Sequence, residues 1–151
     1  MGDFARRWRI AVHEAGHEIA ARVLGVPVSV AARFTADGGA METGFPADAR
    51  DLAVVALAGP CAEAMLAGGV REDAEAAWKG DVDMVAALLD LTGADVLPLL
   101  ERADELVAEH RSRIVARAWK LSQGAAARNA SVVGDLVKGS RACRRAPAVG
   151  G

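Results

Sequence analysis

The most informative stretch of the sequence is His13-Glu14-Ala15-Gly16-His17, which places two histidines four residues apart around a glutamate. On a helix, residues four apart lie on the same face, so both imidazoles can reach one metal ion. Glu14 projects about 100° round the helix from His13, which places its carboxylate near a water on that ion rather than on the ion itself. This pattern is typical of zinc hydrolases, in which the glutamate accepts a proton as the water attacks a carbonyl.

Gly16 favours a functional role for this stretch over a plain amphipathic helix whose histidines only make hydrogen bonds. A glycine inside a helix costs about 1 kcal/mol relative to alanine, so it indicates that another group approaches the backbone closely. Two imidazoles and a base still leave a zinc site one ligand short. The His-x-x-Gly-x-x-His continuation used by some zinc proteases is excluded, because Ala20 and Val23 stand where its glycine and histidine would be.

Four distant side chains are candidates for the third ligand, namely Glu63, Asp81, Asp83 and His110. Asp81 starts an apolar periodic segment, a position that suits a helix N-cap as well as a metal ligand. Asp83 lies about 200° round the same helix, so the two aspartates are not expected to face one ion. Glu63 could complete the site from another helix or orient a ligand histidine through a hydrogen bond. His110 lies on the apolar stripe of a long helix, which favours a core histidine.

The surrounding sequence predicts a mainly helical domain with one small β-hairpin. Apolar residues recur every three or four positions over 4–24, and Gly25 stands where that helix would end. Alternating valines and the Asp37-Gly38-Gly39 turn predict a hairpin over 26–45, between the first and second helices. Further helices are expected over 48–67, 80–91, 96–122 and 131–139. Pro60 is expected to kink or split the second helix.

Length, charge and cysteine content narrow the class of protein. The 151 residues fit one domain over 1–140, followed by a disordered tail over 141–151. A net charge of −2 gives no electrostatic case for nucleic acid as a partner, and no apolar run is long enough for a membrane span. Two distant cysteines do not make a disulfide framework, which favours a reducing, cytoplasmic location.

The chain resembles the peptidase domain of the FtsH family of ATP-dependent zinc proteases. The resemblance is most specific at His13-Glu14-Ala15-Gly16-His17. It continues in Leu57-Ala58-Gly59-Pro60-Cys61-Ala62-Glu63 and in Gly80-Asp81-Val82-Asp83-Met84-Val85-Ala86-Ala87-Leu88. The tail has a similar layout of a long helix and a short final one, so the resemblance spans most of the chain. The sequence departs from the family where Pro60 replaces a usual basic residue, and in lacking the small Thr-Gly-Ala-like run before the aspartate.

The resemblance implies a zinc metalloendopeptidase in which His13, His17 and Asp81 bind Zn²⁺, Glu14 is the base, and Glu63 is a supporting acid near the site. The 151 residues carry no P-loop to drive unfolding, so we expect cleavage of flexible or already unfolded polypeptides. An extended substrate would lie along an edge strand of the hairpin. Alternatively, the chain would depend on a partner, either a separate ATPase or further copies of itself in a homo-oligomer. The alternatives are a catalytically inactive metal-binding module of the same fold and a helical adaptor without metal.

Overall fold

The computed structural model of the chain describes residues 2–36 and 38–124. Its elements are, in order, α1 (Asp3–Leu24), β1 (Val28–Thr35), β2 (Gly38–Thr43), α2 (Ala49–Leu66), α3 (Ala74–Ala77), α4 (Lys79–Thr92) and α5 (Val96–Glu109). A further helical segment covers 111–124. The predicted fold class, mainly helical with a small hairpin between the first two helices, is confirmed. The helix expected over 131–139, the domain end at 140 and the tail over 141–151 fall outside the described residues.

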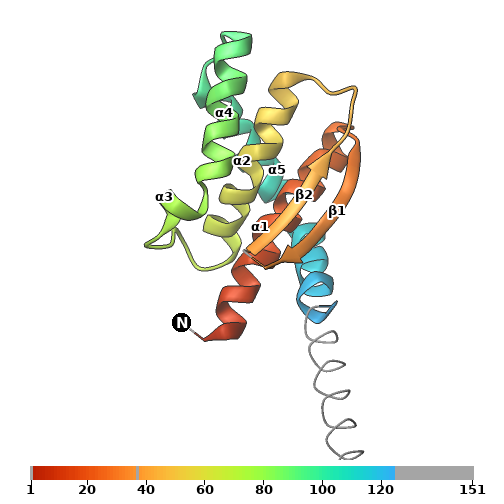
Figure 1. Cartoon of the computed structure of the whole chain (residues 1–151), viewed down its shortest axis with the longest axis vertical. Helices are drawn as coiled ribbons and strands as arrows, with labels where there is room; N and C mark the ends of the chain where they lie inside the picture. Colours follow the sequence, from red (N-terminus) through yellow and green to blue (C-terminus); the bar gives the residue numbers. More distant parts are fainter. Residues whose placement is uncertain (1, 37, 125–151) are drawn as a thin grey trace, which may run out of the picture.

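Helices α1 and α2 pack against each other, with the hairpin on α1 and with α4 and α5 against α2 (Figure 1). The two helices meet through small, fully buried side chains, Ala11 and Ala15 on α1 and Ala58 and Ala62 on α2. A Cβ at Gly16 would lie only 2.7 Å from both the Ala58 carbonyl oxygen and the Ala62 Cβ. The close approach that a glycine inside α1 predicted is therefore the contact with α2.

The hairpin is attached to α1 through the buried carboxylate of Glu18. The backbone N–H of Ala32 on β1 donates to Glu18 Oε2 at 2.9 Å, and Arg117 Nε donates to the same oxygen at 3.0 Å. Arg22 donates to Glu18 Oε1 at 2.9 Å. Burial raises the pKa of Glu18, but these hydrogen bonds outweigh it and hold the pKa below its ordinary value. One ionised carboxylate thus connects α1, β1 and the segment 111–124.

Two helices differ from the sequence expectation. The single helix expected over 96–122 is broken at His110, where α5 ends. The two halves have different partners, since α5 packs on α2 while Arg117 of the second half reaches Glu18 and the hairpin. Helix α2 runs through Pro60 without being split, with buried residues on both sides of the proline. No helix of the described residues is long and apolar enough to cross a membrane.

Candidate metal centre

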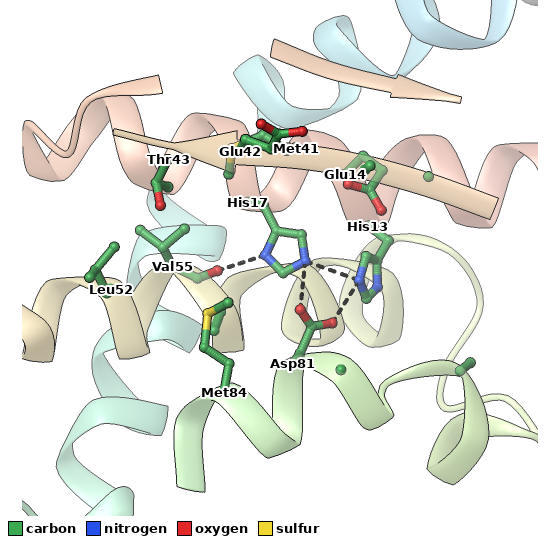
Figure 2. Close-up of a pocket in the computed structure, with 15 residues that line it drawn as sticks. His13, Glu14, His17, Met41, Glu42, Thr43, Leu52, Val55, Asp81 and Met84 are labelled. Carbon is green, nitrogen blue, oxygen red and sulfur yellow. Dashed lines mark hydrogen bonds and ion pairs between the residues drawn. The ribbon is translucent and has the colours of Figure 1, made fainter. Parts of the chain in front are cut away.

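Three potential ligands from two helices meet at one point. His13 and His17 lie one turn apart on α1, and Asp81 faces them from the first turn of α4 (Figure 2). His13 Nε2 lies 3.0 Å from Asp81 Oδ2, and His17 Nε2 lies 3.3 Å from Asp81 Oδ1. The two Nε2 atoms are 3.0 Å apart. These ligand atoms all lie within 4.8 Å of one another, and the group could hold a metal ion.

The second ring nitrogen of each histidine, Nδ1, makes a hydrogen bond on the side away from Asp81. His17 Nδ1 lies 2.7 Å from the Val55 carbonyl oxygen, and His13 Nδ1 lies 3.1 Å from Glu63 Oε2. A carbonyl or an ionised carboxylate only accepts hydrogen bonds, so each neutral ring carries its proton on Nδ1 and presents a lone pair at Nε2. When both rings are neutral, two lone pairs 3.0 Å apart repel each other unless a proton or a metal ion lies between them. The hydrogen bonding therefore prepares this point for a cation.

The spacing of the ligand atoms and their chemistry fit zinc. Zinc bonds of about 2.0–2.1 Å in a tetrahedron separate two ligand atoms by about 3.3 Å. His13 Nε2 lies 3.0 Å from one Asp81 oxygen and His17 Nε2 lies 3.3 Å from the other, and both separations are close to this value. Two imidazoles and one carboxylate are also a donor set that zinc accepts while keeping a fourth position open.

The electrostatics of the group favour positive charge at the same point. Burial alone would lower the pKa of His13, but the hydrogen bonds to Asp81 and Glu63 outweigh it and raise the pKa to about 9. Burial would raise the pKa of Asp81, yet its hydrogen bonds with His13 and His17 hold that pKa far below its ordinary value. Asp81 is therefore ionised, as a metal ligand must be.

Glu14 lies next to His13 and under β2 (Figure 2). Its side chain is buried and lines the same cavity as the three ligands, and it makes no hydrogen bond or ion pair with another described side chain. Burial raises the pKa of Glu14, while His17 and His13 oppose the rise. A Cβ at Gly39 of β2 would lie 2.6 Å from Glu14 Oε1. Any residue other than glycine at position 39 would therefore displace the Glu14 carboxylate.

Glu63 contacts His13 on the side of the ring away from Asp81 and is not one of the three potential ligands. Its carboxylate is fully buried on α2 and faces His13 Nδ1, the ring nitrogen opposite the metal-facing one. Trp78 Nε1 donates to Glu63 Oε2 at 2.8 Å, and Arg9 and Arg71 lie 3.4 Å from Oε1. Burial raises the pKa of Glu63, but the hydrogen bonds with His13 and Trp78 and the charge of Arg71 outweigh it and lower the pKa. The hydrogen bond between Trp78 and Glu63 was not predicted from the sequence. The position of Trp78, three residues before Asp81, was a signal that this side chain lies near the site.

The remaining candidates lie elsewhere. Asp83 is exposed and pairs with Lys79 at 2.6 Å, on the side of α4 away from the histidines. His110 is half-buried at the end of α5 and lies 4.0 Å from Glu109, so it is neither a ligand of this group nor a fully buried core residue. The interpretation of Asp81 as a helix N-cap is wrong, because α4 begins at Lys79 and places Asp81 inside its first turn.

A cavity of about 530 Å³ opens over the three ligands and Glu14. Residues 39–43 of β2 form one wall, and Leu52, Val55 and Met84 supply an apolar wall opposite (Figure 2). Among the described residues β2 pairs only with β1, so its second edge has no strand partner. A smaller cavity of about 250 Å³ also borders His13 and Glu14 and reaches Arg71.

Comparison with known proteins assigns no family. No family model matches the sequence, and no curated protein matches it. The function of the centre therefore has to be inferred from its geometry and chemistry.

Proposed function

We propose that this protein is a zinc-dependent metallopeptidase that hydrolyses peptide bonds in flexible or unfolded polypeptides, with a site of the FtsH peptidase type. The observation that carries the proposal is the meeting of His13, His17 and Asp81 in one cavity with Glu14 beside them. The resemblance to the FtsH family selects the same four residues. An open cavity over three ligands is typical of catalytic zinc sites, whereas structural sites are closed by a fourth protein ligand.

Each of these side chains has its own role in the proposed hydrolysis. His13, His17 and Asp81 would hold the metal, and the partners of the two Nδ1 atoms keep the rings in place. Bound zinc supplies Lewis acidity, which polarises the peptide carbonyl and acidifies water. Glu14 accepts the proton of the attacking water and returns it to the leaving amine. Its raised pKa suits the accepting step, because a carboxylate with a higher pKa takes up a proton more readily.

The walls of the cavity support a polypeptide substrate in extended form. Within residues 2–36 and 38–124 the outer edge of β2 has no strand partner, so a peptide can add there as a third strand, which brings one of its carbonyl groups across the ligands. Leu52 and Met84 would then contact a substrate side chain from the opposite wall. Only flexible or unfolded chains offer such a segment. The cytoplasmic location and a homo-oligomer or ATPase partner stay predictions of the sequence.

The test compares Glu14→Gln with Glu105→Gln, a matched substitution at an exposed residue of α5 that pairs with Arg102 and does not line the cavity. Zinc content would be measured by mass spectrometry after purification without chelator, and hydrolysis with fluorescently labelled casein. We expect one zinc per chain in both variants, full hydrolysis by Glu105→Gln, and a loss of at least about 100-fold in Glu14→Gln.

Three other results would contradict parts of the proposal. Full activity of the Glu14→Gln variant would remove Glu14 as the base. Stoichiometric zinc in the wild-type protein without cleavage of any unfolded substrate would favour the inactive metal-binding module. Protein without stoichiometric zinc would favour the helical adaptor.

A further inference from the structure

The helix that carries Asp81 is only lightly anchored in the core. Of the residues of α4, Val85 alone is buried, while Val82 and Met84 are more than half exposed. The short helix α3 before it buries no residue, and no side chain caps the start of α4. Apolar packing therefore does little to hold the first turn of α4, which must present Asp81 to the histidines within a few tenths of an ångström.

A hydrogen bond supplies the missing anchor at the junction between α3 and α4. The indole Nε1 of Trp78 donates to Glu63 Oε2 at 2.8 Å. The same oxygen lies 3.1 Å from His13 Nδ1, so one carboxylate atom joins Trp78 to a ligand histidine. Glu63 is 1% exposed and sits on α2, which packs directly on α1. The anchor point is thus part of the rigid core.

Backbone hydrogen bonds couple the position of Trp78 to that of Asp81. Trp78 N–H donates to the Ala74 carbonyl at 2.9 Å, and the Trp78 carbonyl accepts from the N–H of Val82 at 2.9 Å. This second bond closes the first turn of α4, and Asp81 lies within that turn. A movement of Trp78 therefore moves the Asp81 carboxylate relative to His13 and His17.

We propose that Trp78 is a positioning residue of the metal centre, whose indole N–H, bound to Glu63, aligns Asp81 with the histidine that Glu63 also orients. One buried carboxylate then sets the relative position of two ligands 68 residues apart in the chain. Arg71 also reaches Glu63, but at 3.4 Å and from a position before α3, so it does not control the start of α4 directly. The inference rests on the metal group and does not need peptide hydrolysis.

The test removes the indole N–H and keeps an aromatic ring, with Trp78→Phe, and measures Zn²⁺ affinity by competition with a chromogenic chelator. Loss of a group that orients a ligand costs about 10- to 100-fold in metal affinity, and we expect a loss in this range. The matched control is Trp8→Phe, because Trp8 packs on the core from α1 and does not line the cavity. Its zinc affinity should equal that of the wild type, and cooperative thermal unfolding in EDTA should show that both variants are folded without zinc.

A double-mutant cycle distinguishes positioning through Glu63 from general packing. In a Glu63→Ala background the indole has no carboxylate to bind, so Trp78→Phe should cause little further loss of zinc affinity. An equal loss in both backgrounds, or wild-type affinity of Trp78→Phe, would overturn the inference and leave the proposed function standing. A wild-type protein that binds no zinc would overturn both.

A second measurement keeps Trp78 itself intact. The chain has three tryptophans, so the variant Trp8→Phe/Trp119→Phe leaves Trp78 as the only indole. Its fluorescence should change on addition of Zn²⁺, with a saturation curve that gives the affinity measured by the chelator. Emission that does not respond while zinc binds would contradict the link between the indole and the site.

Discussion

Replacing Gly59 with alanine should displace His17 and remove it from the metal centre. Gly59 lies on α2 directly against the imidazole, and an added Cβ would lie 2.8 Å from His17 Cδ2 and closer still to Nε2 and Cε1. Ordinary contacts between such atoms are about 3.5–4.0 Å, so the ring has to retreat by about 1 Å or more. Zinc bonds tolerate deviations of only about 0.2 Å, and the displaced Nε2 can no longer serve as a ligand.

The size of the effect follows from these contacts. Losing an orienting partner of a ligand costs about 10- to 100-fold in affinity, so displacing the ligand itself should cost at least about 100-fold. The zinc-free protein should also lose about 1–3 kcal/mol of stability, the usual cost of overpacking a buried site. The gain of about 1 kcal/mol for alanine over glycine inside a helix is offset by loss of the hydrogen bond between His17 and the Val55 carbonyl.

The assay is zinc affinity by chelator competition, with thermal unfolding in EDTA as the measure of stability. Gly80→Ala is the matched control, since Gly80 lies in α4 next to Asp81 and its Cβ would meet no atom within 4 Å. We expect wild-type zinc affinity for Gly80→Ala. Tight zinc binding by Gly59→Ala would refute the assignment of His17 as a ligand in this geometry.

Two further substitutions test the base and the support of the hairpin. Gly39→Ala should push the Glu14 carboxylate from its place, leave zinc content unchanged and lower the hydrolysis of casein about 100-fold, and wild-type activity would contradict the position of Glu14. Glu18→Gln should lower the free energy of unfolding by about 1–3 kcal/mol at pH 7, because it leaves buried donors poorly satisfied. The pKa of Glu18 is lowered by folding, so its contribution is present above its ordinary pKa of 4.5 and lost as the pH falls below it. Chemical denaturation between about pH 7 and pH 3 should therefore show a steeper loss of stability for the wild type than for the variant, and parallel curves would contradict this.

Elements marked by local signals were predictable from the sequence. The apolar repeat over 4–24 matches α1 closely, and Gly25 adopts the left-handed conformation, with a φ of 71°, that ends the helix. The hairpin expected over 26–45 is present, although Gly38 and Gly39 pair with Thr35 and Phe34 as the first residues of β2 and do not form the turn. The spacing of His13 and His17 on one helical face likewise needed only the period of the α-helix.

Features that depend on distant contacts were not predictable in the same way. Residues alone left Asp81 open as a cap or a ligand, because the choice depends on where α4 lies against a histidine 68 residues away. The bond between Trp78 and Glu63 and the break at His110 have no periodic signature, since packing against α2 and the hairpin decides both. Gly39 looked like a turn residue, whereas it pairs with Phe34 in β2 and leaves room there for the Glu14 side chain.

The most direct test of the metal centre is a crystal structure of the protein grown with Zn²⁺, with anomalous data collected at the zinc edge. The geometry predicts one anomalous peak at about 2.0–2.2 Å from His13 Nε2, His17 Nε2 and an Asp81 oxygen, with Glu14 beside it. A peak on Glu63 in place of Asp81, or full zinc occupancy elsewhere with the three side chains apart, would contradict the account.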